Sequence, residues 1–68
     1  MSPTARQVGT RVRQIWTRKA LSQAEVARRA GFTREYVNKI EAGRYDPPLS
    51  TLNSLARALG VAVRELLG

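Results

Sequence analysis

The sequence predicts an all-α domain built from five short helices. Three features predict this fold class: apolar residues recur at intervals of three and four, a serine or threonine precedes most of these stretches, and glycines end several of them. No stretch alternates apolar and polar residues in the way that a half-buried β-strand would. A chain of 68 residues is short enough for one domain, so we expect residues 1–68 to form a single unit.

The first predicted helix begins near Thr4, which has the spacing of a capping box with Gln7. Gly9 lies inside this helix and costs about 1 kcal/mol relative to alanine, so the position of its start is left open. One face of the helix is apolar, with the i, i+4, i+7, i+8 pattern formed by Val8, Val12, Ile15 and Trp16.

Two further helices follow, separated by a short turn. Ser22 and Glu25 form the S-x-x-E capping box that begins the second helix, and Gly31 ends it because glycine tolerates positive φ. Thr33 caps a third helix, which runs to about Ala42. A turn of about three residues makes the two helices cross steeply.

The remaining chain is predicted to form a loop and two more helices. The sequence RYDPP, residues 44–48, is a loop because its prolines cannot continue a helix. Ser50 is expected to cap the fourth helix, which Gly60 ends. A short fifth helix then carries the apolar residues Val61, Val63, Leu66 and Leu67.

The charge of the chain indicates the kind of partner it binds. Twelve Lys and Arg residues against five Asp and Glu residues give a formal net charge of +7, which favours a polyanion. Most of these cations are arginines, whose guanidinium can bind phosphate or guanine through two parallel hydrogen bonds. The codon usage of a GC-rich genome is an alternative reason for the arginines, but it explains the net charge less well.

The sequence contains no cysteine and no histidine. It therefore lacks thiolate metal ligands and the residue that most often serves as a general base. We expect no enzyme activity, no cofactor, no metal site and no small-molecule ligand. The N-terminus has no signal-peptide pattern, and no segment approaches the roughly 20 apolar residues of a membrane helix. We therefore expect a cytoplasmic protein with no membrane partner.

The third helix is unusually polar for so small a domain. Val37 and Ile40 are the apolar residues that can attach it to the rest of the protein. Its other positions leave an exposed face with donors and acceptors, formed by Arg34, Glu35, Asn38 and Lys39. A helix of this kind fits the major groove of B-DNA, where the base edges offer hydrogen-bonding groups.

At these residues the sequence resembles a known family. The run LSQAEVARRAGFTREYVNKIEAG resembles the helix-turn-helix of phage repressor and Cro-like (XRE-type) transcriptional regulators, and the resemblance extends from about Val8 to Leu67. It implies a lambda-repressor-like domain with its helix-turn-helix at about residues 23–42. It also implies a prokaryotic or phage-encoded homodimer that binds a palindromic operator in double-stranded DNA through the major groove.

The resemblance assigns roles to individual residues. The base-reading positions match Arg34, Glu35, Lys39 and Tyr36. The positions that contact the DNA backbone match Gln23, Ser22, Thr33, Asn38, Arg44 and Tyr45. In the family, Gln23's position bridges a phosphate and the start of the recognition helix. Three alternatives stay open: Arg34 as a phosphate clamp, Glu35 as a favourable charge for the helix dipole, and Tyr36 as a residue lying on the second helix.

Two positions depart from the family or stay ambiguous. The family often pairs the residue matching Glu41 with an arginine in the first helix, but Trp16 stands there, so the partner of Glu41 is left open. The resemblance implies a dimer seam at Val63, Leu66 and Leu67, although these residues can also be core.

The expected function is sequence-specific regulation of transcription, most simply repression, and a restriction–modification controller is one form of it. The alternative is an antitoxin-type module whose main partner is a toxin protein. Antitoxins usually need an extra segment to cover the toxin, and few residues of this chain lie outside the matched region.

Overall fold

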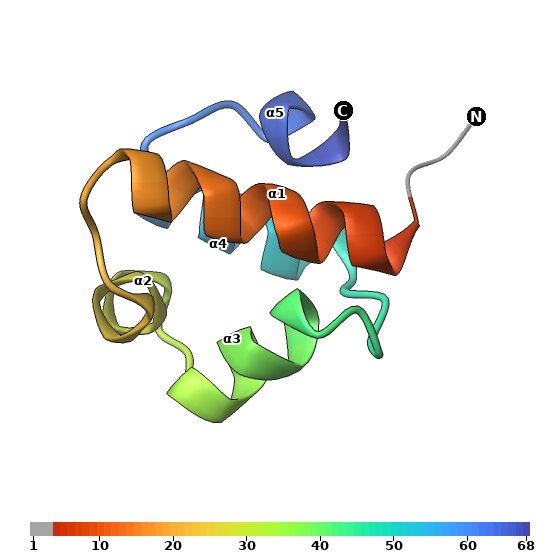
Figure 1. The fold of residues 1–68 in the computed structure, drawn as a ribbon, viewed down its shortest axis with the longest axis horizontal. Helices are drawn as coiled ribbons and strands as arrows, with labels where there is room; N and C mark the ends of the chain where they lie inside the picture. Colours follow the sequence, from red (N-terminus) through yellow and green to blue (C-terminus); the bar gives the residue numbers. More distant parts are fainter. Residues whose placement is uncertain (1–3) are drawn as a thin grey trace.

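The computed structural model describes residues 4–68. These residues form five helices, and this part of the chain contains no strand (Figure 1). The helices are α1 (Ala5–Arg18), α2 (Gln23–Ala30), α3 (Arg34–Glu41), α4 (Leu49–Leu59) and α5 (Arg64–Leu67). In Figure 1, α1 crosses the middle of the molecule, with α5 on one side of it, α2 and α3 on the other, and α4 behind. The predicted all-α fold class is confirmed.

The start of α1 agrees with the sequence signal. The backbone N–H of Gln7 donates to Thr4 Oγ1 at 3.1 Å, and the backbone N–H of Thr4 donates to Gln7 Oε1 at 2.8 Å, so the capping box is closed on both sides. The structure explains why glycine occupies position 9, which the sequence did not reveal. A Cβ at this position would overlap the carbonyl oxygen of Ile40, so the missing side chain lets α1 lie directly on the end of α3.

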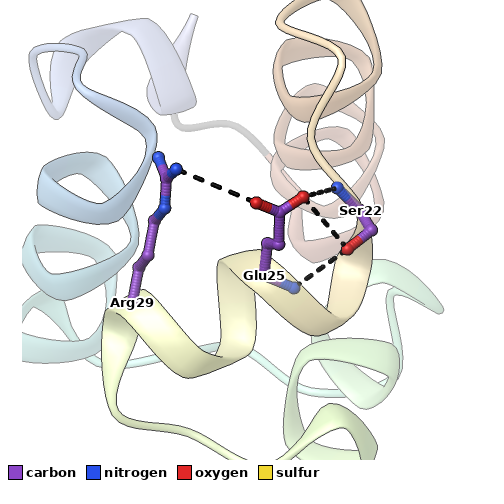
Figure 2. A network of polar contacts seen from close by, with 3 residues as sticks. All are labelled: Ser22, Glu25 and Arg29. Carbon is purple, nitrogen blue, oxygen red and sulfur yellow. Dashed lines mark hydrogen bonds and ion pairs between the residues drawn. The ribbon is translucent and has the colours of Figure 1, made fainter.

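The turn between α1 and α2 contains no glycine. Ala20 takes up a left-handed conformation with φ of 58°, and the backbone N–H of Leu21 donates to the carbonyl of Trp16 at 2.9 Å. Ser22 and Glu25 then close the predicted capping box, with Glu25 N–H donating to Ser22 Oγ at 3.1 Å. Figure 2 shows this box and the Arg29 guanidinium, which lies 3.9 Å from the Glu25 carboxylate.

The ends of α2 and α3 follow the predicted pattern. Gly31 ends α2 with φ of 78°, and Thr33 Oγ1 accepts from the backbone N–H of Tyr36 at 3.1 Å as the cap of α3. Helix α3 ends at Glu41, with Ala42 as its C-cap.

The predicted cap of α4 is wrong. The helix begins at Leu49, and its N-cap is Pro48, which offers no side-chain hydrogen bond. Pro48 can hold this place because its ring fixes φ, here at −68°, without any need for a capping acceptor. Ser50 therefore lies inside the first turn of α4. Gly60 ends the helix as predicted.

Helix α5 is shorter than predicted, because Val61 and Val63 precede it. The side chain of Arg11 fastens α5 to α1, with Nε donating to the backbone carbonyl of Glu65 at 2.8 Å. All five helices contribute to one core, which contains the buried residues Val8, Val12, Ile15, Val26, Ile40, Leu52, Leu55, Ala56, Leu59 and Leu66. Within residues 4–68, no helix combines the length and the apolar character that crossing a membrane requires.

Candidate nucleic-acid interface

Helix α3 has two fully buried residues and exposes most of the others. Val37 and Ile40 are both 0% exposed and anchor the helix in the core. Four polar side chains of α3 are exposed, as predicted: Arg34, Glu35, Asn38 and Lys39. The turn that orients the helix is closed by a hydrogen bond of 2.8 Å from the Phe32 N–H to the Ala27 carbonyl. The protein therefore presents a polar helix at its surface.

Gln23, the first residue of α2, contacts α3 directly. Its Nε2 donates to Glu41 Oε1 at 3.3 Å and, more weakly, to Asn38 Oδ1 at 3.5 Å. These hydrogen bonds reach the middle and the end of α3, while Gln23 also lines a hollow with Arg34 and Glu35 at the start of that helix. Since a carboxylate only accepts hydrogen bonds, it dictates that the NH₂ group of Gln23 faces Glu41.

The open question about Glu41 is resolved by Trp16. The indole Nε1 of Trp16 donates to Glu41 Oε2 at 2.8 Å, while Gln23 occupies the other oxygen. Trp16 thus serves as a hydrogen-bond donor to Glu41 besides packing against the core. This contact joins residues 25 positions apart, and the sequence offered no local signal for it.

Two adjacent hollows lie where α1, α2 and α3 meet. A hollow of about 350 Å³ is lined by Gln23, Arg34, Glu35 and Asn38. A second, of about 530 Å³, shares three of these residues and adds others from α1, from the turn before α2 and from the end of α3. It is lined by Arg13, Trp16, Leu21, Ser22, Gln23, Arg34, Asn38 and Glu41. Sequence reasoning missed Arg13 and Trp16 as parts of this surface.

Tyr36 is half-buried and contacts other side chains of the protein. Its ring packs edge-on against Phe32 with centroids 4.9 Å apart, and its hydroxyl lies 3.2 Å from the Tyr45 hydroxyl and 3.0 Å from Thr51 Oγ1. The partners in these contacts belong to the turn before α3, the following loop and α4. The geometry favours a role in holding α3 to α4 over base reading.

Lys39 and Tyr45 form a second group beside α3. The Nζ atom of Lys39 lies 4.7 Å from the centroid of the Tyr45 ring, a cation–π distance. The hydrogen bond that Tyr45 shares with the Tyr36 hydroxyl, together with burial and the negative charge of Asp46, raises the pKa of Tyr45. Like an ordinary tyrosine, Tyr45 is protonated at neutral pH, so its hydroxyl is able to donate. Arg44, the neighbour of Tyr45, is exposed.

The two capping residues keep donor capacity. Ser22 Oγ and Thr33 Oγ1 each accept a backbone N–H, which occupies a lone pair and leaves the hydroxyl hydrogen for another partner. The hydroxyl of Ser22 lies 3.5 Å from Glu25 Oε1, a weak contact. Both positions are exposed, so both can reach an external anion.

The predicted dimer seam is wrong at one of its three positions. Leu66 is 1% exposed, so its side chain is covered by its own chain and has no surface for a partner. Val63 and Leu67 are partly exposed and stay candidates. Leu49 was not predicted as a seam residue, yet it is the large apolar side chain that stands out as exposed in residues 4–68, at 62%.

A family model described as a helix-turn-helix domain matches residues 7–67 of this chain. Among curated proteins, the immunity repressor of Bacillus phage phi105 is 41% identical over 61 residues, which cover 90% of this chain. The match spans 42% of the phage repressor's length.

Two solved structures have the same fold. The restriction–modification controller protein C.AhdI from Aeromonas hydrophila superposes with a TM-score of 0.87 at 37% identity, covering 91% of this chain and 94% of that one. SinR of Bacillus subtilis, a master regulator of biofilm formation solved in complex with DNA, superposes with a TM-score of 0.81 at 30% identity, covering 87% and 95%. By its sequence and its fold, the chain belongs to the helix-turn-helix family of phage repressor and Cro-like transcriptional regulators.

Proposed function

We propose that this protein binds double-stranded DNA sequence-specifically and regulates transcription, in the simplest case as a repressor. Helix α3 enters the major groove, and the two hollows beside it receive the adjacent DNA backbone. One observation carries the proposal: α3 is anchored in the core through the fully buried residues Val37 and Ile40 and exposes Arg34, Glu35, Asn38 and Lys39 together. The net charge of +7 supplies attraction to phosphate at long range.

The proposed roles divide by position on α3 and around it. Arg34 and Glu35, at the N-terminal end of α3, contact base edges, since this end of a recognition helix reaches deepest into the groove. Gln23, Arg44 and Tyr45 flank the helix and contact phosphates. The relatives support this reading, because the phage protein is an immunity repressor and SinR was solved with DNA.

The first experiment is selection of bound sequences from a random duplex library at moderate salt. A palindromic consensus with half-sites about one helical turn apart is the expected result for a dimer that reads bases. Binding that depends on salt but not on sequence contradicts the proposal. In that case an antitoxin-type role becomes the better reading, and a search for a toxin partner follows.

Variants of two arginines separate base reading from phosphate binding. Arg34→Ala is expected to relax the preference at one base pair of each half-site, by about 1–3 kcal/mol of discrimination. Arg44→Ala is expected to weaken binding to all sequences alike and to reduce the slope of log K against log salt by about 1. Arg57→Ala, an exposed arginine on α4, is the control for loss of charge alone. An unchanged consensus in Arg34→Ala contradicts the assignment of Arg34.

A further inference from the structure

We propose that Trp16 is a positioning residue for DNA binding, acting through Glu41 on the polar side chains of Gln23 and Asn38. The inference rests on the proposed function and adds a residue of α1, outside the helix-turn-helix, to the apparatus that sets specificity. The side chains form a continuous path across three helices: Trp16 on α1, Glu41 and Asn38 on α3, and Gln23 on α2.

The carboxylate of Glu41 is the centre of this path. Its Oε2 accepts from the Trp16 indole at 2.8 Å, and its Oε1 accepts from Gln23 at 3.3 Å, so each oxygen has one donor from a different helix. The shorter contact belongs to Trp16, and it is the one that determines the rotation of the carboxyl group. With that rotation, Oε1 faces Gln23 and accepts from its NH₂ group.

The orientation of the Gln23 side chain then determines which hydrogen-bonding groups α2 and α3 present to DNA. Because the NH₂ group of Gln23 faces Glu41 and Asn38, its carbonyl oxygen is directed elsewhere and makes no hydrogen bond within residues 4–68. Its contact with Asn38 in turn holds the amide of that exposed residue. Gln23, Asn38 and Arg34 all line both hollows, so a change in the carboxyl group of Glu41 reaches the surface that meets DNA.

Trp16 orients the carboxylate of Glu41 without neutralising its charge. Between residues 4 and 68, the ion pair of the structure joins Arg29 to Glu25, and Glu41 is held by two neutral donors instead. A neutral donor fixes the carboxylate but leaves its full charge to attract the NH₂ group of Gln23.

The test compares two duplexes of equal length: the consensus selected by the wild-type protein and a scrambled version of it. Trp16→Phe keeps most of the ring and removes the indole N–H. We expect its affinity for the consensus to fall about tenfold, the size of effect that loss of a hydrogen bond to a charged group produces. The affinity for the scrambled duplex stays within a factor of two or so, because phosphate contacts supply it.

Rescue and stability controls separate positioning from packing. Trp16→Arg restores N–H donors to Glu41 and is expected to recover most of the preference for the consensus. Val61→Ala removes partly buried apolar surface away from both hollows and serves as the control for a general loss of stability, which thermal melting measures for every variant. If Trp16→Phe does not fold, Glu41→Gln takes its place, because its amide puts an NH₂ group where one of the two carboxylate oxygens was, and that group cannot accept from the donor it faces.

A measurement without DNA tests the same path. In ¹H–¹⁵N spectra, the side-chain NH₂ signals of Gln23 are expected to move toward free-amide positions in Trp16→Phe and to return in Trp16→Arg. Unchanged Gln23 signals in Trp16→Phe overturn the inference, and so does an equal loss of affinity for both duplexes or no loss for either. If the wild-type protein itself prefers no sequence, the proposed function fails, while the spectra still decide whether Trp16 positions Gln23.

Discussion

At the scale of single residues, Gly9 decides how closely α1 can lie on α3. It is buried within a helix, where glycine is normally less favourable than alanine. A Cβ at this position would meet the carbonyl oxygen of Ile40 and stand 2.9 Å from the Cα of Glu41, both backbone atoms that cannot turn away. The same contact sets the distance between Trp16 on α1 and Glu41 on α3, so Gly9 also supports the candidate site.

Gly9→Ala is therefore expected to destabilise the fold, although it improves helix propensity by about 1 kcal/mol. Overpacking against rigid backbone costs about 1–3 kcal/mol, so the net free energy of unfolding should fall. Urea denaturation followed by circular dichroism measures it. Thr10→Ala, at the exposed neighbouring position of α1, is the control and should leave stability equal or slightly higher. A more stable Gly9→Ala variant would falsify the close approach of the two helices.

At the scale of elements, the short helices depend on how their ends are satisfied. Ser22 begins α2 by accepting the N–H of Glu25, and the Glu25 carboxylate returns a contact to the Ser22 N–H at 3.3 Å (Figure 2). Helix α4 has no side-chain cap, because Pro48 stands at its N-cap. Two serines that look alike in the sequence, Ser22 and Ser50, therefore have different structural roles.

Alanine substitution should distinguish these two serines. Ser22→Ala removes a cap and is expected to lower the free energy of unfolding by about 0.5–2 kcal/mol. Ser50→Ala removes a hydroxyl inside the first turn of α4 and is expected to change stability by about 0.5 kcal/mol or less. Thermal melting of both variants under one condition makes the comparison. Equal losses would mean that Ser50 caps α4 after all.

At the scale of the whole molecule, the dimensions are compatible with a dimer on DNA. The longest extent of the protein is 30 Å, and successive major grooves on one face of B-DNA are about 34 Å apart. Two copies side by side can thus present two α3 helices at the required separation. Helices α5 and α3 lie on different sides of α1, so contact between copies through α5 leaves α3 uncovered (Figure 1).

The proposed seam can be tested by placing charge on its exposed residues. We expect the wild-type protein to sediment as a dimer and the double variant Val63→Asp, Leu67→Asp to sediment as a monomer at the same concentration. Leu66→Asp is unsuitable, because a charge at a fully buried position unfolds the chain. Leu49→Asp is the matched comparison on α4: a monomer in that variant together with a dimer in the double variant would locate the seam at Leu49 instead.

Several features could be predicted from the sequence because their signals are local. The capping residues Thr4, Ser22 and Thr33 act on backbone groups within one turn, and Gly31 and Gly60 end helices by a conformation that other residues avoid. The polar face of α3 was equally visible, since helical spacing alone separates Val37 and Ile40 from their exposed neighbours. For these features the sequence determined both the fold class and the central part of the candidate site.

Other features were decided only by the tertiary structure, because they depend on residues distant in the chain. The Trp16–Glu41 hydrogen bond and the overlap that excludes a side chain at Gly9 both require α1 to lie on α3. Burial of Leu66 and the inward contacts of Tyr36 depend on which helices meet. Apolar spacing shows that a side chain turns inward or outward from its helix, but not whether the surface it meets belongs to its own chain. The packing of the helices decides whether such a side chain is covered by its own chain or left exposed to a partner.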